Sequence, residues 1–232
     1  MLRVFNIVPP SLVLACAAIP SAAQSTAILQ GSVVEAATGK PIPAALVIAT
    51  RTTLPPFRQT VQSNSDGNFQ ISNLPAGAYS LCARFASDGY LDSCEWGQSA
   101  PSVAAVAGQT SSAIVIRVVK ASVLKVHIQD SNQLLFQKTS AGAVPDLTIG
   151  VFGPHSIFYS TRLDSRAVTS ADYHINIPFD TPLSLSVMSQ ALQLADATGA
   201  ALPRTGIQVP FQHATGNPNP PSFSYTVLGL AH

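Results

Sequence analysis

Histidine and carboxylate side chains are the residues that would have to converge for metal-assisted hydrolysis. A zinc hydrolase needs two or three such ligands and a general base. The chain has two glutamates, Glu35 and Glu95, and neither lies three residues after a histidine. His127 and Asp130 are three residues apart, but on a strand such residues point to opposite faces. The other histidines stand singly, and we expect them to be solvated or to lie in turns: His155, His174, His213 and His232. The sequence therefore predicts no metal site and no cofactor.

Nucleophilic catalysis also lacks a motif. The chain contains no Gly-x-Ser-x-Gly elbow, no phosphate-binding loop and no dinucleotide fingerprint. We therefore predict no catalytic residues and a protein that is not an enzyme.

The best candidate for ligand binding is the segment ASDGYLDSCEWG, residues 86–97. It gathers acidic and aromatic side chains: Asp88, Tyr90, Asp92, Glu95 and Trp96. The rings can stack on a sugar whose hydroxyls donate to the carboxylates, or the carboxylates can hold a calcium ion. The alternative is that the rings cover a sheet edge or the junction of two domains and that the acids are solvated.

Two cysteines flank this segment. Cys82 and Cys94 remain when the N-terminal Cys16 is set aside, and an even number in an oxidising compartment predicts a disulfide. If Tyr79 and Leu81 face the core, Cys82 points outward, so the disulfide would hold the segment against the outside of a sheet. Closing so short a loop stabilises the fold by about 3 kcal/mol. We call residues 86–97 the stapled loop.

The N-terminus, MLRVFNIVPPSLVLACAAIPSAAQ, is typical of an export signal. Arg3 precedes an apolar run, and small residues allow cleavage after Ala23, so residues 1–23 are the predicted signal peptide. Residues 13–16 form a loose lipobox, and acylation of Cys16 is the less favoured alternative. No later run is long enough for a transmembrane segment. We expect an extracytoplasmic protein that is secreted, periplasmic or at the cell surface.

The composition excludes charged partners. Only 10% of the residues are charged and the net charge is +1. The sequence therefore predicts no basic surface of the kind that binds nucleic acid or an anionic membrane. The length beyond the signal suits one large or two small domains. The oligomeric state is not predicted.

Short alternating runs separated by Gly, Pro, Asn and Asp predict an all-β protein. Strands are expected near 27–35, 45–52, 57–63, 68–73, 78–86, 112–120, 123–130, 147–152, 157–163, 173–177, 183–189 and 223–228. Residues 64–67 are predicted to form a hairpin turn, and residues 74–77 reverse the chain again. The side chains expected to face the core are Phe69, Ile71, Tyr79, Leu81, Ala83 and Phe85.

A weak internal repeat divides the chain. Residues 169–187 resemble residues 64–82, and LKVHIQD (124–130) resembles LQGSVVE (29–35). We therefore predict two tandem antiparallel β-sandwich domains, at 24–119 and 120–232, with a Pro-rich segment at 213–222.

The pattern of turn and core residues in the first domain resembles a known family. Gly31-x-Val33 and Pro41-Ile42-Pro43 come first, and Ser65-Asp66-Gly67-x-Phe69 and Leu74-Pro75-x-Gly77-x-Tyr79 follow. This order resembles the carboxypeptidase regulatory-like domain, a transthyretin-like sandwich of about seven strands. The resemblance implies a carbohydrate-binding-like fold that accompanies catalytic domains without itself being catalytic, so no active-site residue transfers.

These observations predict a non-catalytic binding or structural module of the bacterial envelope. One alternative is a carbohydrate-binding module, and another is an accessory domain of a peptidase or other hydrolase system. The partners to test are accordingly a glycan and an envelope protein.

Overall fold

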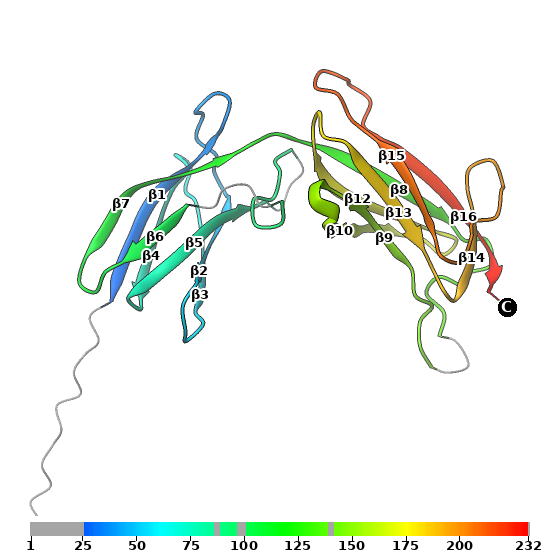
Figure 1. Cartoon of the computed structure of the whole chain (residues 1–232), viewed down its shortest axis with the longest axis horizontal. Coiled ribbons are helices and arrows are strands. Elements are labelled where there is room, and N and C mark those ends of the chain that lie inside the picture. The colour runs from blue at the N-terminus through cyan, green and yellow to red at the C-terminus, as the bar shows by residue number, and fades with distance from the viewer. Residues whose placement is uncertain (1–25, 86–88, 97–100, 139–141, 232) are drawn as a thin grey trace, which may run out of the picture.

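The computed structural model describes residues 26–85, 89–96, 101–138 and 142–231, and its strands form four sheets (Figure 1). Among these residues, the helical element is a single 3-10 turn, η1 (Pro154–Ser156). The all-β class is confirmed. The predicted signal peptide and the alternative lipid site at Cys16 lie outside the described residues.

The first unit is a sandwich built from residues 27–118. One sheet has the order β4 (Asn68–Leu74), β1 (Ala27–Glu35), β7 (Thr110–Val118). The other has the order β3 (Arg58–Gln62), β2 (Leu46–Arg51), β5 (Gly77–Arg84), β6 (Ser102–Ala105). As alternation predicted, Phe69 and Ile71 of β4 and Tyr79 and Leu81 of β5 are buried between the sheets. They belong to one cluster that excludes water from both inner faces.

The second unit is also a sandwich. Its larger sheet has the order β11 (Arg162–Arg166), β12 (Ser170–Pro178), β8 (Ala121–Gln129), β16 (Ser222–Leu230), β14 (Leu192–Ala195). Its smaller sheet has the order β10 (Phe158–Ser160), β9 (Thr148–Phe152), β13 (Leu183–Met188), β15 (Ile207–Phe211). A second cluster of buried side chains, from Leu124 to Val227, fills the space between them. The division of the chain near residue 120 nevertheless stays a prediction.

The two units repeat one arrangement of strands. In the first, β1 pairs antiparallel with β4 and parallel with β7; in the second, β8 pairs antiparallel with β12 and parallel with β16. The parallel pairs differ from the antiparallel sandwich expected from the sequence. Parallel neighbours need a long crossover, and the intervening strands of each unit supply one. The alternation of apolar and polar residues within a strand does not reveal whether its neighbour runs parallel or antiparallel to it.

The two predicted turns are present, but neither joins neighbouring strands of one sheet. The turn at residues 64–67 leads from β3 to β4, and the turn at 74–77 leads from β4 to β5, so each carries the chain across the sandwich. The hairpin prediction is therefore wrong in its pairing. Asn64 fixes the first turn because its Oδ1 accepts from the backbone N–H groups of Asp66 (3.0 Å) and Asn68 (2.9 Å). Gly67 has φ +72°, and a Cβ there would lie 2.7 Å from the carbonyl oxygen of Val33.

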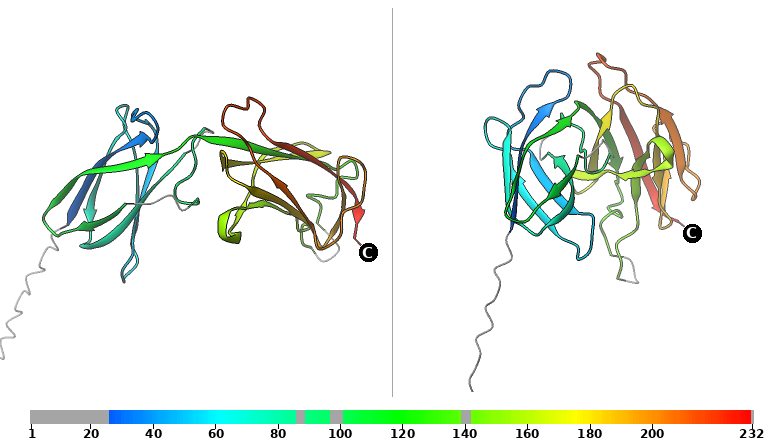
Figure 2. Two further views of the ribbon diagram at one scale, coloured as in Figure 1. Left: turned by 45° about the horizontal axis from the view of Figure 1, so that its top comes forward. Right: turned by 60° about the vertical axis from the view of Figure 1, so that its left-hand side comes forward.

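Only Val119 and Lys120 separate β7 from β8, which run on as one long ribbon between the units (Figures 1 and 2). The stapled loop pairs with this connection. The N–H of Leu91 donates to the carbonyl of Val119 (2.9 Å), and the N–H of Ala121 donates to the carbonyl of Gly89 (3.0 Å). The short link between the units is thus held on one side by residues 89–91.

Candidate functional site

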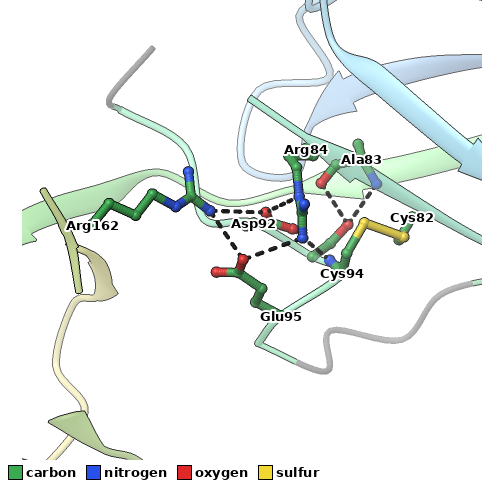
Figure 3. Close-up of a disulfide and its surroundings, with 8 residues drawn as sticks. Cys82, Ala83, Arg84, Asp92, Cys94, Glu95 and Arg162 are labelled. Atoms are coloured by element: carbon green, nitrogen blue, oxygen red, sulfur yellow. Dashed lines mark hydrogen bonds and ion pairs between the residues drawn. A yellow bond between two sulfur atoms is a disulfide. The ribbon is translucent and has the colours of Figure 1, made fainter. Parts of the chain in front are cut away.

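The stapled loop is fixed to β5 by a disulfide and by a serine (Figure 3). Cys82 and Cys94 are bonded, with their Cα atoms 5.1 Å apart, which confirms the predicted pair. Ser93 is buried, and its Oγ accepts from the N–H of Ala83 (2.8 Å) and donates to the carbonyl of the same residue (3.1 Å). The N–H of Ser93 also donates to that carbonyl (3.2 Å), so this residue pairs with both backbone groups of Ala83 in a buried position.

Asp92 organises the turn that follows. Its side chain is only 8% exposed. Oδ1 accepts from the N–H of Cys94 (2.9 Å), and Oδ2 lies 2.7 Å from Nε of Arg84 on β5. Its backbone carbonyl accepts from the N–H of Trp96 (3.0 Å). A carboxylate so desolvated is stable only when paired, and here the backbone and a guanidinium supply the partners.

A second guanidinium reaches the same carboxylates from the other unit. Nη2 of Arg162, at the start of β11, lies 3.0 Å from Glu95 Oε1 and 3.6 Å from Asp92 Oδ2, while Nη2 of Arg84 lies 3.2 Å from the same oxygen of Glu95 (Figure 3). Two arginines, one from each unit, therefore share two carboxylates, and the network is neutral. No role was predicted for Arg84 or Arg162 from the sequence.

Trp96 is the main apolar contact between the units. Its ring stacks on Tyr159 of β10, with centroids 3.9 Å apart and planes inclined by 16°. It packs against the buried cluster of the second unit, although the chain places it in the first. Gly153 makes room for this pair, because a Cβ there would lie 2.8 Å from Tyr159 Cε2 and 3.2 Å from Trp96 Cζ3.

Tyr90 contacts the second unit through its backbone. Its carbonyl accepts from Nδ2 of Asn176 on β12 (3.2 Å). Its ring packs against Phe85 of the first unit, with centroids 5.2 Å apart. Four of the five predicted ligand-binding residues thus lie where the first unit contacts Tyr159, Arg162 and Asn176 of the second. We call this contact the junction. Asp88 lies outside the described residues.

Little space remains between these side chains. The cavity that they line measures about 20 Å³, which accommodates about one water molecule. Within the described residues, no three histidine, cysteine, aspartate or glutamate side chains are grouped so as to hold a metal ion. The same part of the chain has no helix long and apolar enough to cross a membrane.

Comparison with known families identifies the first unit. Residues 28–119 match the family model of the carboxypeptidase regulatory-like domain. We refer to these residues as the regulatory-like domain. The regulatory-like domain therefore contains β1 to β7 and contributes the stapled loop to the junction. No curated protein matches the chain.

Several solved structures share a general likeness with the regulatory-like domain and the unit that follows it. The streptococcal ancillary pilin is 10% identical, with a TM-score of 0.41 over 88% of this chain and 62% of that chain. The Bacillus anthracis TIE protein is 14% identical, with a TM-score of 0.35 over 88% and 34%. The minor pilin GBS52 of Streptococcus agalactiae is 21% identical, with a TM-score of 0.31 over 42% and 45%. The chain spans between about a third and three-fifths of the length of these three.

The residues that complete the junction were missed from the sequence because most of them lie outside the regulatory-like domain. Tyr159, Arg162 and Asn176 follow Trp96 by more than sixty positions. Nothing in their local sequence pattern distinguishes them from other strand residues that lie outside a core.

Proposed function

We propose that the chain is a non-catalytic, extracytoplasmic module in which the stapled loop holds the regulatory-like domain and the second unit in one relative orientation. The observation that carries the proposal is the position of Trp96. This side chain belongs to the first unit and packs into the second, stacked on Tyr159. Burying an aromatic ring across a junction restricts relative motion, because separating the units would return the ring to water.

The link between the units supports the same role. A two-residue connection is short enough to limit bending, and its backbone groups on one side are occupied by Gly89 and Leu91. The ion network adds polar contacts whose geometry depends on the relative position of the units. Because Arg162 and Glu95 are partly exposed, we expect their ion pair to favour one relative orientation of the units and to add little to the free energy of unfolding.

The glycan and calcium roles predicted for Asp88, Tyr90, Asp92, Glu95 and Trp96 stay predictions. One face of the Trp96 ring is covered by Tyr159, and Asp92 already has three hydrogen-bonding or ionic partners. A cavity of about 20 Å³ is too small for a sugar ring. These contacts favour the structural role over the binding role at this place.

An extracytoplasmic location fits this design. The contacts with the second unit come from a loop that is closed by a disulfide, and disulfides persist in oxidising compartments and are rare in the cytosol. Stiff modules of this kind suit a protein that spaces or presents other envelope components, and an envelope protein is the partner we propose.

Backbone ¹⁵N relaxation of the purified chain tests the proposal. If the units are held together, their amides report one common rotational diffusion tensor. We expect the amides of the Trp96→Ala variant to report a separate rotational diffusion tensor for each unit, because each unit then tumbles faster and more independently. Arg162→Ala should have a smaller effect in the same direction.

Two matched variants serve as controls. Phe57→Ala removes an aromatic ring that packs against the first cluster away from the junction, and Arg58→Ala removes another exposed strand arginine. Both should leave the common tensor intact. Independent tumbling of the units in the unaltered chain would refute the proposal.

A further inference from the structure

A broad groove is lined by residues of β4, β1 and β7. These strands form a different sheet from the one that contains β5, to which the stapled loop is attached; Figure 1 shows the strands. Its volume is about 640 Å³, which is within the range of small-ligand sites, about 300 to 1,000 Å³. Gln30 and Ser32 of β1 and Asn68 and Gln70 of β4 contribute to its lining. The groove can therefore take a ligand, unlike the small cavity at the junction.

The lining of the groove contains amide and hydroxyl groups and no charged side chain. Two of the amides are already ordered: Nε2 of Gln30 donates to Oε1 of Gln70 (2.7 Å), and Nε2 of Gln70 donates to Oγ of Ser72 (3.1 Å). The side chains of Ser32, Asn68 and Ser112 have no hydrogen-bond partner within the described residues. The groove thus combines a fixed row of amides with neutral donors and acceptors that are free for a ligand.

An irregularity of β7 shapes one wall of the groove. Between the pairs Leu29 with Ser111 and Gly31 with Ile114, β7 has two residues where β1 has one. These residues are Ser112 and Ala113, and Ala113 has φ +63°, in the left-handed region that residues other than glycine rarely adopt. Such bulges redirect side chains and occur preferentially at sheet edges and next to functional sites.

The chemistry of the lining selects among ligand classes. Neutral amides and hydroxyls match a ligand dense in uncharged hydroxyl groups, and the lining has no positive charge to pair with a phosphate or a carboxylate. A protein partner would use buried Trp, Tyr or Arg contacts, and none of these residues lines the groove. A partner strand would pair with the backbone of a sheet edge, whereas the lining includes side chains of β1, the central strand of this sheet.

We propose that this groove binds a neutral oligosaccharide through Gln30, Gln70, Asn68 and the serines beside them. The proposal goes beyond the structural role of the junction and does not depend on it. The aromatic residue of the lining, Phe69, is only 5% exposed and offers no open platform, so hydrogen bonds must hold each sugar. We expect dissociation constants between about 0.1 and 1 mM.

The test is an NMR titration of the purified chain with short neutral oligosaccharides of glucose, mannose and N-acetylglucosamine. An acidic oligosaccharide of galacturonic acid is titrated in parallel, each at up to about 5 mM so that weak binding is seen. At least one neutral sugar should shift the amide signals of β1, β4 and β7. Gln70→Ala should weaken that binding by about three- to tenfold.

Gln208→Ala is the matched control, because Gln208 is another exposed glutamine on a strand, in the other unit, and binding should not change. The same spectra show that each variant is folded. The proposal is overturned if no neutral sugar shifts these signals, if the shifts centre on Trp96, or if the acidic sugar binds better. None of these outcomes affects the relaxation test of the junction, so the two proposals fail separately.

Discussion

Arg84 and Arg162 occupy similar positions in the ion network but differ in what their removal would leave behind. Arg84 lies 2.7 Å from the buried carboxylate of Asp92, whereas the nearest partner of Arg162 is Glu95, whose side chain is 34% exposed. Water can replace a partner at Glu95 but not readily at Asp92. The cost of losing each arginine should therefore follow the burial of the acid and not the number of contacts.

We expect Arg84→Ala to lower the free energy of unfolding by about 1 to 3 kcal/mol, since it leaves a buried carboxylate poorly paired. Arg162→Ala should cost less than about 1 kcal/mol. Urea unfolding measures both, with Arg58→Ala as the control for loss of an exposed arginine. Equal losses for Arg84 and Arg162 would contradict this account of Asp92.

Glu35 at the end of β1 gives the fold a pH dependence. The hydroxyl of Thr38 donates to its Oε2 (2.6 Å) and Lys120 lies 3.4 Å from Oε1, and the Thr38 hydrogen bond is the main reason that the pKa of this carboxyl is lowered. A lowered pKa means that the folded state favours the carboxylate. Its contribution is complete above the ordinary glutamate pKa of about 4.3 and is lost as the pH falls through the folded value.

Glu35→Gln should therefore destabilise the chain at neutral pH, and the difference from the unaltered chain should shrink below about pH 4. Urea midpoints measured from pH 7 to pH 3 test this. Thr38→Ala removes the donor with the largest effect and should reduce the same pH-dependent difference. A constant difference at all these pH values would show that Glu35 acts only through packing.

At the scale of elements, the stapled loop is attached to the sheet that contains β5 and also forms the first unit's side of the junction. The disulfide and Ser93 attach it to β5, and residues 89–91 attach it to the start of β8. Because Trp96 follows Cys94 by two residues, the cross-link also limits where the tryptophan can lie. The loop can therefore transmit a change at the disulfide to the contact with Tyr159.

The double variant Cys82→Ser, Cys94→Ser should lose about 3 kcal/mol of stability, because the unfolded chain regains the entropy of a loop with a separation of 12 residues. Trp96 is the only tryptophan, so its fluorescence reports on the junction directly. We expect a red-shifted emission maximum and stronger quenching by acrylamide in the folded variant. Unchanged emission would mean that the disulfide does not position Trp96.

At the scale of the whole molecule, the two units follow one another along the chain (Figure 2). Each has its own cluster of buried side chains, and they share the junction. Each cluster is large enough to exclude water from the inner faces of its own sheets. We therefore predict that residues 24–119 and 120–232 each fold when expressed alone, which tests the division near residue 120.

The isolated first unit should expose Trp96, because the stacking partner Tyr159 lies in the second. Its tryptophan emission should be red-shifted relative to that of the full chain, and near-ultraviolet circular dichroism should show that tertiary structure remains. Failure of either half to fold would instead mean that the two clusters depend on each other, and the predicted boundary would be wrong.

Much of the fold was predictable because local patterns determine it. The alternation of apolar and polar residues located most strands, and the turn residues located the reversals at 64–67 and 74–77. The strands β6, β14 and β15 were missed, and the single strand expected at 157–163 is divided between β10 and β11. In β6 and β14, four residues leave little alternation to detect. The pairing across those turns was also missed, because a turn fixes a change of direction but not the sheet that the next strand joins.

The sequence by itself determined the all-β class, the inward faces of the strands, the outward Cys82 and its disulfide with Cys94, because these depend on parity and on residues close in the chain. The tertiary structure decided the parallel pairs, the roles of Arg84 and Arg162, and the stacking of Trp96 on Tyr159. These contacts join residues far apart in sequence. Their formation depends on how two sandwiches meet, which no local pattern encodes.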